Sequence, residues 1–250
     1  MDLTTTAIVC AVRGHGENGA IVRLLTPADG LQPGYVRGGR SRRLRPVLQP
    51  GNRVEVRLVA RVDSQLAAAT IELERSRTLL AATPLGSAAL EWLTALAATA
   101  LTEGAPHPRL YAALDGIFDA MALGAAAPRW LAGVVRFELL LLAELGFGLD
   151  LSACAATGAT HDLAFVSPRS AQAVSRGAGL PYVSKLLPLP PFLLDPELAP
   201  AAPDLIDGLR TTGHFLARDV LTGRAAELLA ARERFVAIVT TQLDAANSGR

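Results

Sequence analysis

"RVEVRLVARVD", residues 53–63, alternates between apolar and polar side chains with a period of two. Apolar residues occupy every even position from Val54 to Val62, and most residues between them are charged. Successive side chains of a β-strand point to opposite faces, so one face of this stretch is apolar and the other is polar. The stretch therefore predicts a half-buried β-strand.

The first 75 residues contain four more runs of this kind, and turn-like residues separate them. These runs occupy residues 6–12, 20–26, 33–37 and 67–73, the last of them after a predicted turn at 63–65. Five short strands with one long loop between the third and the fourth predict a small closed OB-type β-barrel over residues 1–80. A five-stranded SH3-like barrel is the alternative, because strand counting alone does not separate the two folds.

From about Pro84 onward the apolar residues follow a helical period. One apolar stripe runs through residues 110–121 and a second through 131–145, with Pro128 at a typical helix start and Gly146 just past the end. Further helices are predicted at residues 90–101, 204–221 and 225–243. The predicted fold is therefore α+β and multidomain, with an all-α helical domain over residues 81–250 after the barrel.

A segment rich in Gly, Pro and Ser, residues 150–203, forms a small irregular insert in this helical domain. It contains one predicted strand, Leu163–Val166. The sequence "CAATGATHDL", residues 154–163, is typical of a zinc ribbon whose second ligand has become threonine. Zinc needs four ligands, and Cys154 could recruit at most His161 nearby. We therefore expect a degenerate zinc-ribbon-like insert with a buried free thiol and no metal.

The net charge of +1 conceals an uneven distribution along the chain. Residues 1–80 hold twelve arginines and seven acidic residues, whereas residues 81–250 hold twelve basic and sixteen acidic residues. The two cysteines are too few for a disulfide framework. The longest uncharged stretch has thirteen residues, fewer than the ~20 that a membrane span requires. We therefore expect a cytoplasmic protein with no membrane partner.

The most concentrated charge lies in the predicted loop between strands three and four, where "RGGRSRRLR", residues 37–45, holds five arginines. Charge runs are usually solvated loops, but the loops and the open face of OB barrels bind oligonucleotides in many proteins. Each guanidinium can neutralise one phosphate and release a counterion. Since Tyr35 is the only aromatic residue among residues 1–80, base reading by stacking is not expected.

The predicted phosphate contacts are Arg37, Arg40, Arg42, Arg43 and Arg45. Weaker candidates lie on the polar face of the strand at 53–63, where ordinary surface charge is an equally good interpretation: Arg53, Arg57 and Arg61.

No catalytic constellation is recognisable in the sequence. The four histidines lie far apart without metal-binding spacing: His15, His107, His161 and His214. "GHGENG", residues 14–19, lacks the lysine and hydroxyl of a phosphate-binding loop and is interpreted as a hairpin turn. We therefore expect no enzymatic activity, no cofactor and no metal.

Four segments in this order resemble the RecO family of bacterial recombination mediators. They are "TTAIVCAVRGHGENGAIVRLLTPADGL" (5–31), "RGGRSRRLRPVLQPGNRVEV" (37–56), "RFELLLLAELGFGLDLSACAATG" (136–158) and "TGHFLARDVLTGRAAELLAARERFV" (212–236). The resemblance implies an N-terminal OB barrel, a helical domain and an insert that binds zinc in some members. This sequence keeps Cys154 but lacks its partner ligands, so the metal is not carried over.

The resemblance also implies a role in DNA repair. It implies that the protein binds single- and double-stranded DNA, anneals strands coated by single-stranded DNA-binding protein, and with RecR helps to load RecA at the nucleoid. Family members bind the acidic, Phe-ended tail of single-stranded DNA-binding protein on the helical domain. Arg129 and Arg136 could supply the cation for the terminal carboxylate, or could merely flank a core helix.

Two other functions stay open at this point. The protein could be an adaptor whose basic barrel docks an acidic protein partner, with incidental DNA binding. A small hydrolase using His and acidic residues has little support in the sequence.

Overall fold

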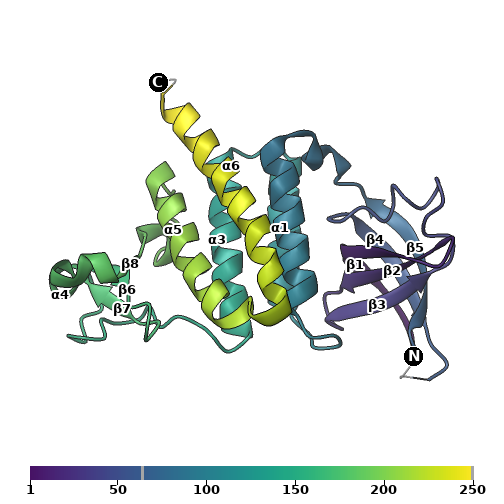
Figure 1. The fold of residues 1–250 in the computed structure, drawn as a ribbon, viewed down its shortest axis with the longest axis horizontal. Helices are drawn as coiled ribbons and strands as arrows, with labels where there is room; N and C mark the ends of the chain where they lie inside the picture. The colour runs from purple at the N-terminus through teal and green to yellow at the C-terminus, as the bar shows by residue number, and fades with distance from the viewer. Residues whose placement is uncertain (63–64, 249–250) are drawn as a thin grey trace. The chain divides into compact units, whose positions relative to one another are not determined.

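The computed structural model describes residues 1–62 and 65–248. Its N-terminal part is a five-stranded barrel (Figure 1) made of β1 (Asp2–His15), β2 (Gly19–Leu25), β3 (Leu31–Val36), β4 (Arg53–Val59) and β5 (Ala67–Arg75). The strands pair in the order β1-β2-β3-β5-β4, and β4 pairs back with β1, which closes the ring. The seam between β3 and β5 is parallel and only two residue pairs long. This is the strand order of the OB fold, which favours it over the SH3-like alternative.

The core of the barrel consists of the alternating apolar side chains that the sequence predicts. In β4, Val54, Val56 and Leu58 are buried, while Glu55 and Arg57 are exposed. Burial of one such aliphatic side chain contributes about 1.5–3 kcal/mol relative to exposure. The long strand β1 pairs first with β4 and then with β2, and an irregularity between Val9 and Ala11 separates its two halves.

Strand β4 ends earlier than the alternation of residues 53–63 predicts. Its last residue, Val59, pairs with Asp2 at the start of β1 and with Ala68, the second residue of β5. The backbone N–H of Ala60 still donates to the Met1 carbonyl at 2.9 Å, and residues 61–62 form a bend. The predicted turn at 63–65 cannot be compared, because residues 63–64 lie outside the described part of the chain.

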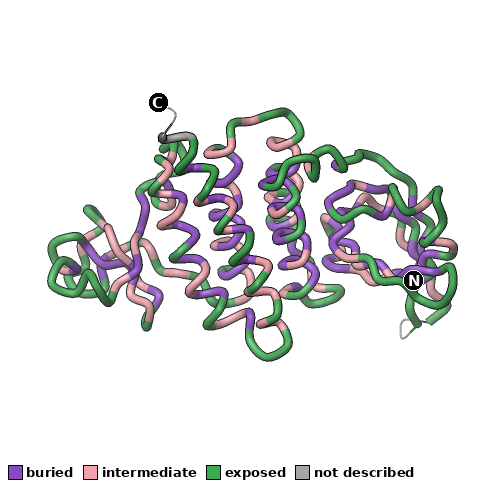
Figure 2. The backbone as a smooth tube through the Cα atoms, turned by 45° about the horizontal axis from the view of Figure 1, so that its top comes forward, coloured by how far each residue is buried: buried purple, intermediate pink, exposed green. Residues whose placement is uncertain are grey.

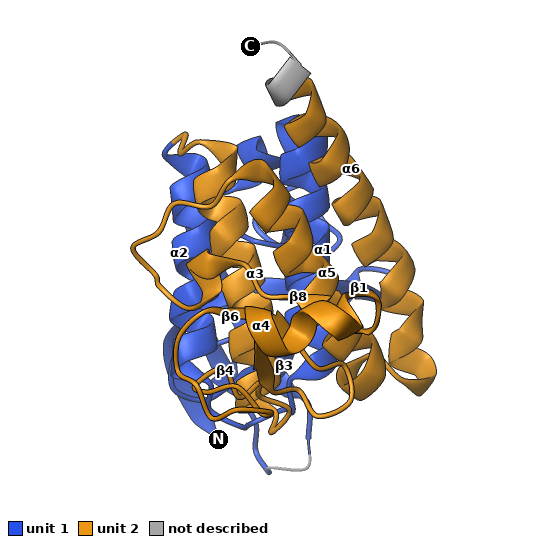
Figure 3. Ribbon diagram, turned by 90° about the vertical axis from the view of Figure 1, so that its left-hand side faces the viewer, with its two compact units in different colours: residues 1–123 blue, residues 124–250 orange. Residues whose placement is uncertain are grey.

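The contacts within the chain define two compact units, residues 1–123 and 124–250 (Figure 3). In unit 1 the barrel is followed by a 3-10 helix η1 (Thr78–Ala82) and by α1 (Pro84–Ala100) and α2 (Pro108–Ala122). The Thr83 hydroxyl caps α1 by accepting a hydrogen bond from the backbone N–H of Gly86 at 3.1 Å. The domain limits drawn from the sequence, after residue 80 and around 150–203, stay predictions.

Unit 2 contains three long helices, α3 (Ala127–Glu144), α5 (Ala202–Phe215) and α6 (Leu228–Ser248). Buried and exposed residues alternate along these helices, as the coloured tube in Figure 2 shows. Glu138 of α3 is fully buried and accepts hydrogen bonds from Arg232 of α6 at 3.1 and 2.8 Å. The helix predicted at 204–221 changes at Leu216 into a single π-helical turn, η4 (Leu216–Val220), and the 3-10 helix η5 (Gly223–Glu227) precedes α6.

The insert contains more regular structure than the sequence predicts. Strand β6 has the predicted bounds, Leu163–Val166, and is the middle strand of a small sheet in the order β7-β6-β8. The other elements are β7 (Ala173–Ser175), α4 (Arg176–Gly179), η2 (Leu180–Lys185), β8 (Leu187–Pro188) and η3 (Pro191–Leu193). Across residues 1–62 and 65–248, every helix is too short or too polar to cross a membrane.

Candidate nucleic-acid interface

The arginine loop, residues 37–52, connects β3 to β4 and folds onto the end of the barrel. A series of backbone hydrogen bonds shapes it, among them Ser41 N–H to Gly38 O at 2.8 Å, Arg45 N–H to Ser41 O at 3.0 Å and Leu48 N–H to Leu44 O at 2.9 Å. The side chain of Leu48 is only 3% exposed and belongs to the barrel core. The loop is therefore anchored, although most of its side chains face solvent.

All five arginines predicted as phosphate contacts are exposed in this loop. Arg40 donates long hydrogen bonds to the carbonyls of Gly16 and Glu17 at 3.4 and 3.2 Å, which hold it near the β1–β2 turn without neutralising it. In the described part of the chain, none of the five forms an ion pair with a carboxylate. The loop thus presents uncompensated guanidinium groups, which is what a phosphate-binding surface requires.

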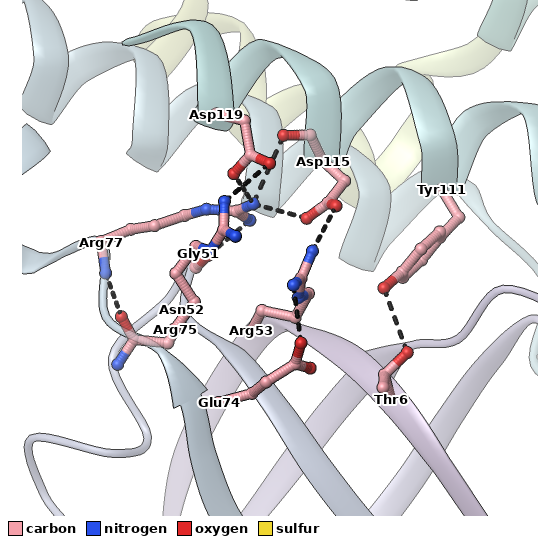
Figure 4. A network of polar contacts seen from close by, with 10 residues as sticks. All are labelled: Thr6, Gly51, Asn52, Arg53, Glu74, Arg75, Arg77, Tyr111, Asp115 and Asp119. Atoms are coloured by element: carbon pink, nitrogen blue, oxygen red, sulfur yellow. Dashed lines mark hydrogen bonds and ion pairs between the residues drawn. The ribbon is translucent and has the colours of Figure 1, made fainter. Parts of the chain in front are cut away.

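The C-terminal end of the arginine loop is held by a buried polar network that reaches α2 (Figure 4). The Asn52 side-chain amide donates to the carbonyls of Pro46 and Val47 at 2.8 and 3.0 Å. The Asn52 side-chain oxygen accepts from the backbone N–H of Arg77 at 2.8 Å. This single asparagine therefore joins the arginine loop to the end of β5.

Arg77 continues the network into α2. Its side chain is fully buried and donates to the Gly51 carbonyl at 3.1 Å and to the carboxylates of Asp115 and Asp119. No sequence pattern indicates this role, because Arg77 looks like one more charged residue after a strand. A hint exists in α2, where Asp115 and Asp119 lie one turn apart on one face.

The three weaker strand candidates are placed differently from the loop arginines. Arg53 is ion-paired with Glu74 at 2.6 Å and with Asp115 at 2.9 Å, and its side chain is only 20% exposed. The hydrogen bond to Glu74 is the main reason why the pKa of Arg53 lies above its ordinary value. Arg57 donates two hydrogen bonds to Asp2, at 3.0 and 2.7 Å, whereas Arg61 is exposed. The charges of Arg53 and Arg57 are already compensated, which weighs against both as phosphate contacts.

Arg129 and Arg136 line a pocket of about 550 Å³ in unit 2, between the start of α3 and residues 196–200. The Arg136 guanidinium donates to the carbonyls of Phe192 and Pro196, both at 3.0 Å, and lies over the Phe192 ring at 5.5 Å. Arg129 is exposed at the rim. The structure therefore brings the two residues to one pocket but gives them different roles, since Arg136 shapes the wall and Arg129 stays accessible.

Cys154 is a buried free thiol in the insert. Its sulfur accepts a hydrogen bond from the backbone N–H of Ser175 at 3.2 Å. The pKa of Cys154 is lowered to about 6, first by hydrogen bonding to the side chain of Ser175 and then by the hydrogen bond to its backbone. In the part of the chain that the structure describes, no three His, Cys, Asp or Glu residues gather as a metal site would require. The four histidines, His15, His107, His161 and His214, form no such cluster either.

Comparison with known proteins decides the family. The family model described as "Recombination protein O N terminal" matches residues 1–76, and the model described as "Recombination protein O C terminal" matches residues 83–225. The chain belongs to the RecO family.

Curated relatives of the RecO family match over almost the whole chain. The DNA repair protein RecO of Rhodospirillum centenum is 48% identical over 239 residues, covering 94% of each chain. The Phenylobacterium zucineum protein of the same name is 49% identical and covers 86% of this chain and 88% of its own. The one from Bradyrhizobium sp. is 46% identical and covers 96% of each. Membership of the RecO family places this chain among the proteins of DNA repair and recombination.

Proposed function

We propose that the chain is a non-enzymatic recombination mediator that grips DNA through phosphates and anneals complementary strands. The observation that carries the proposal is the set of exposed, uncompensated arginines on an anchored loop of the OB barrel. Annealing requires that two phosphate backbones be neutralised irrespective of base order. Guanidinium groups do this by releasing counterions, and no covalent step is needed.

The proposed contacts are Arg37, Arg40, Arg42, Arg43 and Arg45, with Arg61 as a peripheral contact. Single- and double-stranded DNA both present the phosphates that this loop would bind. As a member of the RecO family, the protein would work with RecR in loading RecA onto strands coated by single-stranded DNA-binding protein.

We propose the pocket beside Arg129 as the place where the acidic, Phe-ended tail of single-stranded DNA-binding protein binds. Its lining is mainly Pro and Ala with Leu198, which suits an aromatic end group, and Arg129 at the rim suits a terminal carboxylate. Glu197 also lines the pocket and would oppose acidic residues placed close to it. The terminal carboxylate should therefore lie on the Arg129 side.

Strand annealing by a triple variant tests the main proposal. Arg40→Ala, Arg42→Ala and Arg43→Ala in one chain should abolish most annealing of complementary oligonucleotides, while circular dichroism stays that of the wild type. A control with the same charge change replaces Arg169, Arg210 and Arg224, three exposed arginines of unit 2, and should anneal normally. Undiminished annealing by the loop variant would refute the assignment. If that variant instead loses binding to an acidic protein and not to DNA, the adaptor function gains support.

A further inference from the structure

The end of the barrel beside the arginine loop is an open mouth. In the pairing of β1 with β2, Val12 lies opposite Val22 and Gly14 lies opposite Ala20. Val22 and Ala20 belong to the barrel core, and directly opposite residues of an antiparallel pair share a face. Val12 and Gly14 therefore point inward too, and Gly14 has no side chain to fill the space. A pocket of about 410 Å³ results.

The arginine loop builds the other wall of this mouth, and it does so with a preformed structure. Arg40, Arg45 and Leu48 line the pocket, and Leu48 is fixed in the core. Gly39 packs so closely that an added Cβ would lie 2.7 Å from the Ala20 Cβ. The Asn52 amide holds the carbonyls at 46 and 47. Because this wall is already ordered, little conformational entropy is lost when a ligand binds.

The chemistry of the mouth combines an apolar floor with a cationic rim. Val12 supplies accessible aliphatic surface and Leu48 closes the pocket from the core side, while Arg40 and Arg45 are exposed and carry no carboxylate partner in the described residues. A nucleotide offers the matching pair of features, a flat base with apolar faces beside a phosphate. Guanidinium planes also stack on unpaired bases. The rim continues directly into the other arginines of the loop, so a nucleic-acid strand would pass over this mouth.

We propose that the barrel mouth receives one unpaired nucleobase while Arg40 and Arg45 hold the flanking phosphates. This inference rests on the proposed function and adds a base-binding subsite to it. The floor offers shape and apolar surface, so the subsite accepts bases without regard to sequence. A base that is paired in a duplex cannot enter. The pocket therefore favours single strands and loses its occupant once the strand has annealed.

Oligonucleotides that keep the phosphates but lack the bases test the proposal. We expect the full chain to bind an oligomer of abasic deoxyribose phosphates about tenfold more weakly than oligothymidylate of equal length at the same salt concentration. A tenfold change equals about 1.4 kcal/mol. In the variant Gly14→Leu, which fills the mouth, this ratio should fall to about one while affinity for the abasic oligomer stays unchanged.

The backbone at Gly14 has room for a side chain to begin, because an added Cβ would make only ordinary contacts with Arg40, the nearest at 3.7 Å. The matched control is Gly116→Leu on the exposed face of α2, where nothing lies within 4 Å, and it should keep the tenfold ratio. If circular dichroism shows that Gly14→Leu is unfolded, or if it loses abasic affinity, Val12→Met covers the same floor from a side chain that is 39% exposed. The expected results are the same.

Equal affinity of the wild type for the two oligomers would overturn the base subsite, but it would remain consistent with binding through phosphates. A ratio that persists in both filled variants would overturn it as well, because the bases would then bind elsewhere. Absence of salt-sensitive binding to either oligomer would instead count against the proposed function itself.

Discussion

Replacing Arg77 with Met removes the buried cation that joins the arginine loop to α2. Loss of one partner from a buried ion pair costs about 3–5 kcal/mol, because the other charge is left uncompensated. Here Asp115 keeps Arg53 and Asp119 keeps Arg75 as partners. In the described residues, Nε of Arg77 has no hydrogen-bond partner, so its removal relieves one unsatisfied donor. We therefore expect Arg77→Met to lower the free energy of unfolding by about 3 kcal/mol, the lower end of this range.

Urea unfolding followed by circular dichroism measures this loss in the transition of unit 1. The matched control is Arg75→Met, whose side chain is 48% exposed and pairs with Asp119 at 2.9 Å. An exposed pair contributes little, so this control should lose less than about 1 kcal/mol. Hydrogen exchange of the Leu48 and Asn52 amides should accelerate in Arg77→Met and not in the control. Equal stability of the two variants would refute the reasoning.

The network around Arg77 also makes the stability of the fold depend on pH. Burial acts to raise the pKa of Asp119, but its hydrogen bonds and charge interactions with Arg77 and Arg75 outweigh burial, and the pKa lies below its usual value of 3.8. The ionised carboxylate therefore stabilises the folded state above about pH 4 and loses this contribution as the pH falls through the lowered pKa. Arg77→Met should show a weaker loss of stability on acidification than the wild type, and an unchanged acid profile would contradict this.

Three further predictions concern other parts of the chain. Gly30 has φ +68° and an added Cβ would lie 1.9 Å from the Ala105 carbonyl oxygen, so Gly30→Ala should lose more than about 1 kcal/mol in urea unfolding, whereas Gly16→Ala, with φ +60° and open space, should lose less. Because the pKa of Cys154 is lowered from 9.0 to about 6, the thiolate should make the wild type gain stability relative to Cys154→Ser as the pH rises from 6 to 9; parallel pH profiles would argue against a thiolate. Arg129→Ala should weaken binding of an acidic peptide ending in Phe, measured by fluorescence anisotropy, more than Arg224→Ala does; equal losses would remove Arg129 from that site.

Much of the fold is predictable because its elements have strong local periods. The alternation around Val54, Val56 and Leu58 identifies a barrel strand, and the apolar run Leu163–Val166 gives β6 with its correct bounds. The family is recognisable from the order of four segments. Prediction fails for short elements that have no visible period. Strands β7 and β8 have three and two residues, which are too few to show an alternation.

Contacts between residues far apart in the sequence are the second feature that could not be predicted. The alternation in β4 places Arg53 on the polar face correctly, but it does not reveal that Glu74 and Asp115 meet that arginine. Arg77 is buried against α2, where its guanidinium lies over the Phe118 ring, and its acidic partners in that helix come 38 and 42 residues later. The arginine loop is easier to interpret, since five exposed arginines need no distant partner to bind phosphate.

The salt dependence of DNA affinity tests the phosphate grip most directly. Affinity of the full chain for a single-stranded oligonucleotide should fall linearly with salt on a log–log plot. The slope should become shallower by about 2 in the Arg40→Ala, Arg42→Ala, Arg43→Ala variant, because each lost contact on a single strand removes about 0.7. An identical slope in wild type and variant would contradict the account, since the loop arginines would then release no counterions.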